Sequence, residues 1–128
     1  MRGSRRLLIL LSIFIAGVSA SADAPGREEW VNKVTEDYAG VSAGVEINKR
    51  CSILSRAESE VLERDLGAFT KALRGKINPE FLSMIRETSG TMVAEDPYDS
   101  CGGEARQAVA DARELVDWWL VELKATEQ

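Results

Sequence analysis

The side chain that most often carries acid–base catalysis is missing from this sequence. There is no histidine, which is also the commonest ligand of transition metals. Catalysis by Ser-His-Asp or Cys-His groups is therefore excluded, and an enzyme would have to use carboxylates alone. The 21 Asp and Glu residues form no pair that spacing singles out. We predict a non-enzymatic protein without catalytic residues or a cofactor, and keep a carboxylate-only hydrolase as the second alternative.

One acidic segment has the residue types of a cation site. Residues 95–99, with Glu104 nearby, offer the carboxylate oxygens that Ca²⁺ prefers. The segment lacks the order of acidic residues and glycine that defines a calcium-binding loop. We therefore predict no metal site, and interpret the segment as a loop that ends one helix and caps the next. Its Tyr98 is expected to pack over a disulfide.

The two cysteines, Cys51 and Cys101, lie 50 residues apart. This spacing excludes C-x-x-C redox chemistry and haem attachment. In an oxidising compartment the pair predicts one intramolecular disulfide, with free thiols or an intermolecular bond as the alternatives. Closing a loop of this length stabilises a fold by about 4 kcal/mol in the chain-entropy model.

The N-terminus has the three parts of a secretory signal. Arginines at positions 2, 5 and 6 precede an apolar run from Leu7 to Ile15, and the small residues Ala20 to Ala22 follow. We predict a signal peptide over residues 1–22, cleaved after Ala22, with cleavage after Ala20 as the near alternative. A retained anchor is a further alternative, although the apolar run is shorter than the roughly 20 residues of a membrane span.

Export and charge limit the choice of partners. Without residues 1–22, the net charge changes from −5 to −8, since 13 basic and 21 acidic residues remain. Nucleic acids and anionic lipids bind basic surfaces, so neither is an expected partner. We predict a periplasmic or secreted protein that touches a membrane only through its signal segment.

The rest of the chain, residues 23–128, predicts one all-α domain: a small up-down bundle of about four helices. Apolar residues recur at helical spacing and nowhere alternate as in a strand. After a flexible leader at Pro25 and Gly26, we predict helices over about 28–46, 55–75, 78–92 and 104–124. Glycines 40 and 44 make an earlier end of the first helix, near Gly40, an alternative, and residues 48–52 are its expected connection.

Helix-end signals support these boundaries. Ser55 and Glu58 form a capping box, and Gly75 is typical of a C′ glycine. Asn78 is a good N-cap before Pro79. The last helix is expected to be capped at Asp99 or Ser100.

The predicted apolar faces come from four sets of residues. They are Trp30, Val34, Tyr38, Val41 and Val45; Leu62, Leu66, Phe69 and Leu73; Phe81, Leu82, Ile85 and Met92; and Ala105, Ala108, Val109, Ala112, Val116, Trp119, Leu120 and Leu123. The disulfide would bring the N-termini of the second and fourth helices to one end, with the third helix running back between them.

Two adjacent tryptophans predict a candidate partner surface. Successive helical residues turn by 100°, so Trp118 lies off the face that carries Trp119. It shares a side of the helix with Glu114 and Val121, and tryptophan is enriched in protein interfaces. We expect these three residues to contact a protein partner or a second copy. The alternative is that the first helix or the C-terminal tail covers Trp118.

The layout of Cys51, a helix over Asp65–Leu73 and Cys101 resembles the small periplasmic acid-stress chaperones of the HdeA type. The resemblance implies a client-binding chaperone that opens at low pH. The sequence departs from that family in the long helix before Cys51 and in a C-terminal helix that is not rich in lysine. We therefore expect an exported interaction module without chemistry of its own, and an acid-activated chaperone as the alternative.

Overall fold

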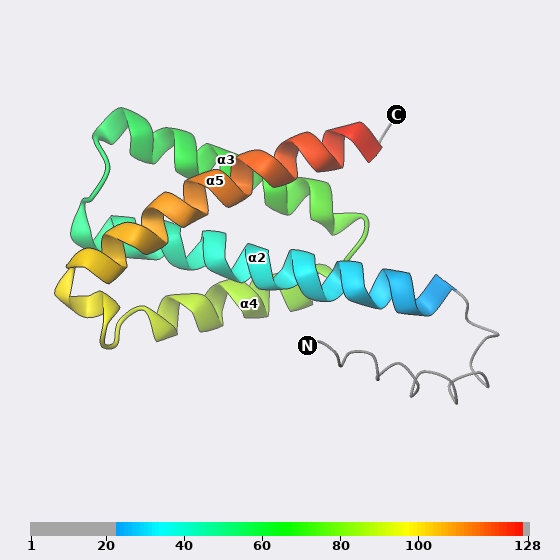
Figure 1. The fold of residues 1–128 in the computed structure, drawn as a ribbon, viewed down its shortest axis with the longest axis horizontal. Coiled ribbons are helices and arrows are strands. Elements are labelled where there is room, and N and C mark those ends of the chain that lie inside the picture. Colours follow the sequence, from blue (N-terminus) through cyan, green and yellow to red (C-terminus); the bar gives the residue numbers. More distant parts are fainter. Residues whose placement is uncertain (1–22, 127–128) are drawn as a thin grey trace, which may run out of the picture. The chain divides into compact units, whose positions relative to one another are not determined.

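A computed structural model of the chain describes residues 23–126. Within them lie four α-helices, one 3₁₀ helix and no strand (Figure 1). The elements are α2 (Asp23–Cys51), α3 (Arg56–Arg74), α4 (Pro79–Met92), η2 (Tyr98–Ser100) and α5 (Gly103–Thr126). The predicted all-α bundle is confirmed, whereas the predicted signal peptide, residues 1–22, lies outside the described residues.

Contacts divide the chain into two units, residues 1–32 and 33–128. The described part of the first unit is the N-terminal portion of α2. The second unit contains the remainder of α2 and all of α3, α4, η2 and α5. The packing described below belongs to this second unit.

The first predicted helix was too short at both ends. Pro25 and Gly26 are not a leader, because α2 already begins at Asp23. Proline is tolerated there because the first turn has no helical bond for its missing N–H to make. At the other end α2 runs to Cys51, through the predicted connection. Ser52 ends the helix with a left-handed φ of 52°.

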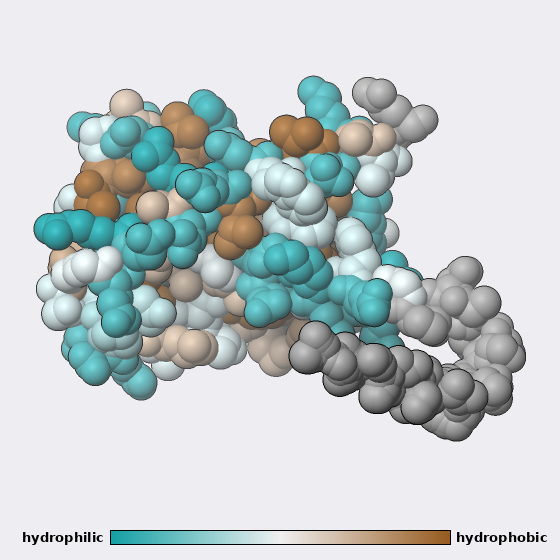
Figure 2. Space-filling view, in the orientation of Figure 1, coloured by the Kyte–Doolittle hydropathy of each residue, from teal (hydrophilic) through white to brown (hydrophobic). Residues whose placement is uncertain are grey.

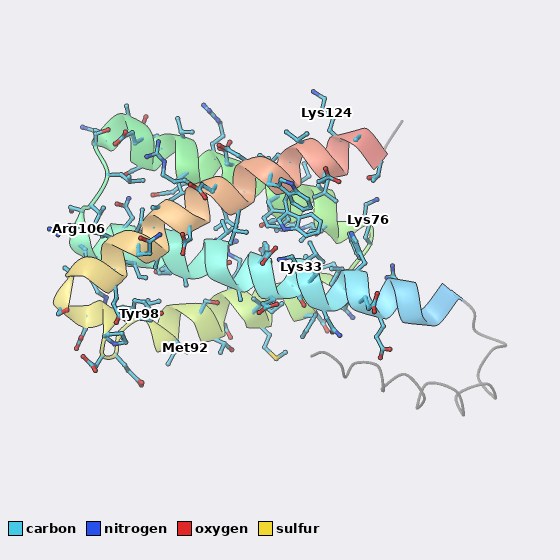
Figure 3. All side chains as sticks on the ribbon, in the orientation of Figure 1. Lys33, Lys76, Met92, Tyr98, Arg106 and Lys124 are labelled. Carbon is cyan, nitrogen blue, oxygen red and sulfur yellow. A yellow bond between two sulfur atoms is a disulfide. The ribbon has the colours of Figure 1, made fainter. Side chains whose placement is uncertain are left out.

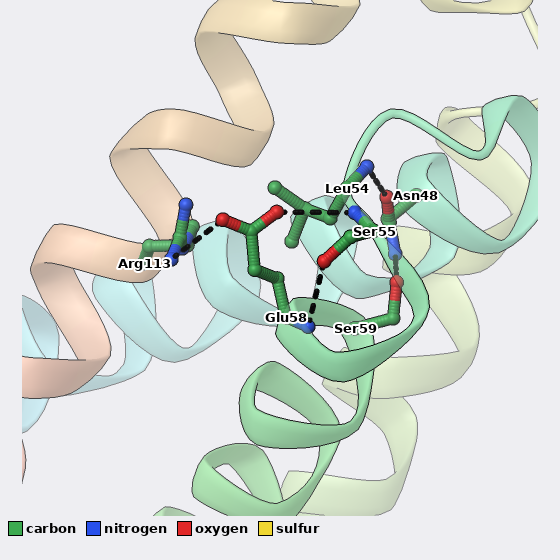
Figure 4. Close-up of polar contacts among 6 residues, drawn as sticks. All are labelled: Asn48, Leu54, Ser55, Glu58, Ser59 and Arg113. Carbon is green, nitrogen blue, oxygen red and sulfur yellow. Dashed lines mark hydrogen bonds and ion pairs between the residues drawn. The ribbon is translucent and has the colours of Figure 1, made fainter.

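Asn48 explains why the chain turns only after Cys51. Its side-chain oxygen accepts a hydrogen bond from the Leu54 N–H at 2.8 Å, and its amide group donates to Ser59 Oγ at 2.6 Å (Figure 4). Both partners lie beyond the helix end, so this buried side chain fastens α2 to the start of α3.

Two predicted caps are present. Ser55 Oγ accepts from the Glu58 N–H at 3.1 Å, and the Glu58 carboxylate accepts from the Ser55 N–H at 3.0 Å. Asn78 caps α4 by accepting from the Glu80 N–H at 2.7 Å.

Of the other two end signals, Gly75 was right in position but not in conformation, and the cap predicted for the last helix was wrong. Gly75 does end α3, but at a φ of −84°, so the left-handed freedom of glycine is not used. Asp99 and Ser100 belong to η2 and do not cap α5, which begins at Gly103. The Ser100 hydroxyl donates instead to the Pro97 carbonyl at 3.2 Å.

Cys51 and Cys101 form the predicted disulfide, with their Cα atoms 5.5 Å apart. The N-termini of α3 and α5 lie at this end of the bundle, and successive helices run in opposite directions (Figure 1). The third predicted helix, α4, does not lie between α3 and α5 as expected, since α3 packs directly on both α5 and α4.

The core follows the predicted stripe on α3 and most of that on α5, where Ala108 and Leu120 are only half-buried. The buried apolar residues of α3 are Leu62, Leu66, Phe69 and Leu73, and those of α5 are Ala105, Val109, Ala112, Val116, Trp119 and Leu123. From α2 the core takes Val34, Tyr38, Val41, Val45 and Ile47.

The predicted apolar face of α4 was largely wrong. Of its four residues only Leu82 is buried, while Phe81 is 39% exposed and Met92 is 60% exposed. Ser89 takes an inward position and donates a hydrogen bond to the Ala39 carbonyl at 3.3 Å. Because α4 approaches α2 through a serine, part of its apolar surface remains at the protein surface.

Candidate partner-binding surface

An apolar groove lies between α4 and α5, with α2 as its floor. Helix α3 packs on both α4 and α5, whereas α4 and α5 have no comparable contact with each other. The gap is a hollow of about 310 Å³. Its lining residues are small or apolar apart from Ser89, Tyr98 and Asp111: they are Ala39, Gly40, Ala43 and Ile47 of α2, Met92 of α4, Val93 just after it, and Ala108 and Leu115 of α5.

Small residues on α2 create the groove and also set the position of α5. Ala39, Gly40 and Ala43 have no long side chain to fill the space above the helix. One turn further on, a methyl group added at Gly44 would overlap the Cβ of Ala112. Helices α2 and α5 are therefore in close contact at Gly44.

The groove is closed near the disulfide. Ile47, Val93, Ala105 and Val109 form a buried cluster there, and Tyr98 packs against it together with Cys51. The Cys51 sulfur lies 4.0 Å from the Tyr98 carbonyl oxygen. Met92 and Tyr98 both lie toward this end (Figure 3). Tyr98 was expected to pack over the disulfide; it lies beside Cys51 against the same cluster, and it also lines the groove.

Trp118 lies at the surface, as the helical spacing predicted. It is 52% exposed and Val121 is 67% exposed, and Glu114 is exposed beside them. The Trp118 ring contacts only part of the core, packing edge-on against Trp119 with centroids 4.9 Å apart. Hydrophobic residues also emerge among hydrophilic ones on the face that carries α5 (Figure 2).

Two of the three predicted surface residues, Glu114 and Trp118, line a hollow that is continuous with the groove, whereas Val121 lines neither hollow. A second hollow is lined by Asp111, Glu114, Leu115 and Trp118, and it shares Asp111 and Leu115 with the groove. The sequence predicted the patch but not the groove, because the groove residues come from helices far apart in the chain. We call the groove and this patch together the α4–α5 surface.

On the side of α5 that faces away from the groove, a buried hydrogen bond holds α5 against α2. The Trp119 indole N–H donates to the Asp37 carboxylate at 2.8 Å, and Lys33 pairs with the same carboxylate at 3.1 Å. The Trp119 ring also stacks on Phe69, with centroids 6.1 Å apart. Sequence reasoning missed Asp37, although its place three residues after Val34 and four before Val41 puts it within the buried arc of α2.

A second buried hydrogen bond joins α2 to α3. The Tyr38 and Thr70 hydroxyl oxygens lie 2.7 Å apart, and the Thr70 hydroxyl donates to the Leu66 carbonyl at 2.8 Å. The single hydroxyl hydrogen of Thr70 is thus used, so Tyr38 is the donor to Thr70. The Tyr38 ring meets Phe69 edge-on at 5.3 Å.

The α5 wall of the groove is acidic. Glu104, Asp111 and Trp118 recur every seven residues, so they share one face of the helix. Glu104 and Asp111 line a third hollow that also contacts Tyr98 and Ala108 of the groove. No Lys or Arg is among the residues that line these three hollows.

The basic residues of α5 lie on a different face. Arg113 points toward α3 and pairs with Glu58 at 3.8 Å (Figure 4). Arg106 is seven residues before Arg113 and Lys124 eleven after it, so both share that face. The Lys49 and Arg50 pair of α2 lines a neighbouring hollow with Glu46 and Gly90, and this hollow shares Val93 with the groove. The α5 wall is therefore acidic, and the nearest basic pair lies beyond Val93 on α2.

Two carboxyl groups on α3 have shifted pKa values, in opposite directions. Hydrogen bonds from the backbone and hydroxyl of Ser55 lower the pKa of Glu58, with a smaller contribution from Arg113. Partial burial raises the pKa of Asp65, and the nearby charge of Asp117 raises it further. Asp65 and Asp117 are neighbouring carboxylates that line a hollow of about 50 Å³, which has space for one or two water molecules.

The acidic segment considered for a cation forms a turn. The Glu95 carbonyl accepts hydrogen bonds from the N–H groups of Tyr98 and Asp99, which leads the chain into η2. Among residues 23–126, no three His, Cys, Asp or Glu side chains are grouped so as to hold a metal ion.

In the same part of the chain, no helix has both the length and the apolar character needed to cross a bilayer.

Comparison of the chain with protein-family models, with curated proteins and with solved structures finds no match. The functional argument therefore rests on the α4–α5 surface itself.

Proposed function

We propose that this protein is an exported, non-catalytic interaction module that binds a segment of a partner protein on the α4–α5 surface. The observation that carries the proposal is the open groove, which is continuous with the half-exposed Trp118. Contiguous apolar surface of this kind marks interaction sites, and tryptophan is enriched among the residues that dominate binding energy.

The framework around the groove supports a preformed site. The disulfide holds the end of α2 beside the start of α5, and the bond from Trp119 to Asp37 fixes α5 farther along. A rigid groove loses little conformational entropy on binding, so more of the contact energy appears as affinity. Export is supported by the signal-like N-terminus and by the disulfide, which persists in oxidising compartments.

Partner capture tests this function. Residues 23–128 with the disulfide formed would be used as bait in an extract of the exporting cell's own compartments, in parallel with Trp118→Asp. A matched control is Val61→Asp, which places the same charge at an exposed valine on α3. We expect a bound protein that is retained by the control and lost with Trp118→Asp. Equal capture by all three baits would contradict the proposal.

An acid-activated chaperone is the second candidate, favoured by the apolar residues exposed on α4. Phe81, Met84 and Met92 are 39%, 52% and 60% exposed. The lowered pKa of Glu58 means that this group favours the folded state above its unfolded pKa, and that this contribution is lost as pH falls through its folded pKa. Protection of a model client from aggregation at about pH 2–3, where carboxylates are protonated, would support this candidate, and inertness there would remove it.

A further inference from the structure

We infer that the occupant of the groove is a cationic amphipathic helix of a partner protein. This inference rests on the proposed interaction function and adds the chemistry of the partner. Its apolar edge would lie along α2 between Met92 and Leu115, and its Lys or Arg side chains would face the acidic wall of α5.

The charge of the α5 wall favours a partner with a positively charged face. Asp111 lines the groove, the hollow beside Trp118 and the hollow beside Tyr98, and Glu104 and Glu114 line one each. No cation lines these three hollows, and Lys49 and Arg50 lie in a further hollow beyond Val93. Asp111 accepts a hydrogen bond from Gln107 at 2.8 Å, which holds its carboxylate on α5 without neutralising it. A cationic partner would therefore find unneutralised carboxylates along the wall, which favours fast and specific association.

Spacing favours a helix as the partner. Glu104 and Asp111 are seven residues apart, which is two turns or about 10.5 Å along α5. Basic residues seven apart on a partner helix have the same separation. The floor consists of Ala39, Gly40 and Ala43, so a partner helix can approach α2 closely without displacing large side chains.

A second copy of this chain fits the surface less well. A symmetric dimer that paired the two α5 walls would place the carboxylates of one copy against those of the other. The whole chain also carries a net charge of −5, so copies repel each other at low salt. Anionic lipid and nucleic acid are disfavoured for the same reason.

The test compares two designed peptides of about 18 residues, or five turns. Both carry the same Leu and Ala edge, and they differ only in having Lys or Glu beside it. Calorimetric titration of the purified, disulfide-bonded protein is expected to show binding of the Lys peptide, at least about tenfold tighter than the Glu peptide and weaker at high salt. Circular dichroism should show the Lys peptide gaining helix on binding.

Charge reversal locates the contact. Asp111→Lys with Glu114→Lys should weaken the Lys peptide by about tenfold or more. The matched control is Glu60→Lys with Glu63→Lys on α3, which changes the net charge equally at exposed positions and should change the affinity by less than about twofold. Equal weakening by both pairs would overturn the inference, because binding would then follow overall charge.

A groove-filling variant separates this inference from the proposed function. Ala43→Phe occupies the floor, and its thermal unfolding would be measured first. If both peptides bind wild type equally and both are lost with Ala43→Phe, the groove is a binding site but the cationic preference is wrong. If neither peptide binds wild type, or if sedimentation shows a dimer that charge reversal at Asp111 and Glu114 abolishes, the cationic helix is not the occupant.

Discussion

Trp118 and Trp119 are consecutive residues of α5, but they belong to two different sides of the bundle. Trp119 is 3% exposed, stacks on Phe69 and donates to Asp37. Trp118 is 52% exposed and lies beside a groove with an acidic wall. One side of α5 is thus closed by aromatic packing and buried hydrogen bonds, and the other side is open.

The same residue type thus has a structural role at Trp119, whereas at Trp118 we propose a role in recognition. On the closed side each polar atom of Asp37, Tyr38 and Thr70 has a partner at a defined distance. On the open side α2 presents Ala39, Gly40 and Ala43, which have no polar side-chain atoms, and the Ala39 carbonyl accepts a hydrogen bond from Ser89 at 3.3 Å. Mutations on the closed side should therefore act on folding, and those on the open side on binding.

The largest effect on stability is expected from removal of the disulfide between Cys51 and Cys101. Replacing Cys51 and Cys101 by serine should lower the free energy of unfolding by about 4 kcal/mol, because the unfolded chain is no longer closed into a loop of about 50 residues. Urea unfolding of the variant and of the wild type measures this. A loss under about 1 kcal/mol would mean that the buried bonds hold α2 and α5 together unaided.

The comparison of the two tryptophans can be made directly with phenylalanine at each position. Trp119→Phe removes the donor to Asp37 and leaves a buried carboxylate short of one bond, which should cost about 2–3 kcal/mol. Trp118→Phe removes no hydrogen bond that holds the closed side and should cost less than about 1 kcal/mol. Thermal unfolding of the two variants compares their losses in the free energy of unfolding. Similar losses would contradict the division of α5 into a closed and an open side.

A methyl group added on α2 should have opposite effects at two glycines. Gly44→Ala places a Cβ against Ala112 and the Ala108 carbonyl and should destabilise the fold by about 1–3 kcal/mol. At Gly40 the nearest atom is Leu115 Cδ1 at 3.6 Å, an ordinary contact. Gly40→Ala should therefore stabilise by up to about 1 kcal/mol through helix propensity. Chemical denaturation of both variants would show whether the signs differ.

The smallest effect concerns Asp65, where α3 meets α5. Because its pKa is raised in the folded state, its contribution to stability is present below the unfolded pKa and is lost as pH rises through the folded pKa. Asp65→Asn should therefore be slightly more stable than wild type at pH 7, and the difference should shrink toward pH 3. Melting temperatures across this range check the sign, and a difference that grows in acid would contradict it.

Local signals predicted the parts of the structure that neighbouring residues decide. The Ser55–Glu58 capping box, the Asn78 cap and the stripe from Leu62 to Leu73 all depend on residues within a few turns of each other. The Cys51–Cys101 pair followed from there being only two cysteines. Helical spacing also separated Trp118 from Trp119.

Predictions failed where distant helices decide the outcome. The end of α2 depends on Asn48 bonding to Leu54 and Ser59 beyond the helix. The apolar residues of α4 were assigned to the core, but Ser89 faces α2 and leaves Met92 outside. No local sequence pattern predicts the contacts of Asn48 or Ser89, because each contact involves a partner in another element.

The sequence alone determined that this chain forms helices, where two of them are capped, which cysteines pair and which tryptophan leaves the core. These properties follow from the 100° turn per residue and from bonds within one or two turns. Only the tertiary structure decided that α4 and α5 stand apart over the small residues of α2. That groove arises because Gly44 lets α5 approach α2 closely while α3 packs on both flanking helices. Its acidic wall forms only in the folded chain, where Asp111 lines the groove and Glu104 lines the hollow beside it.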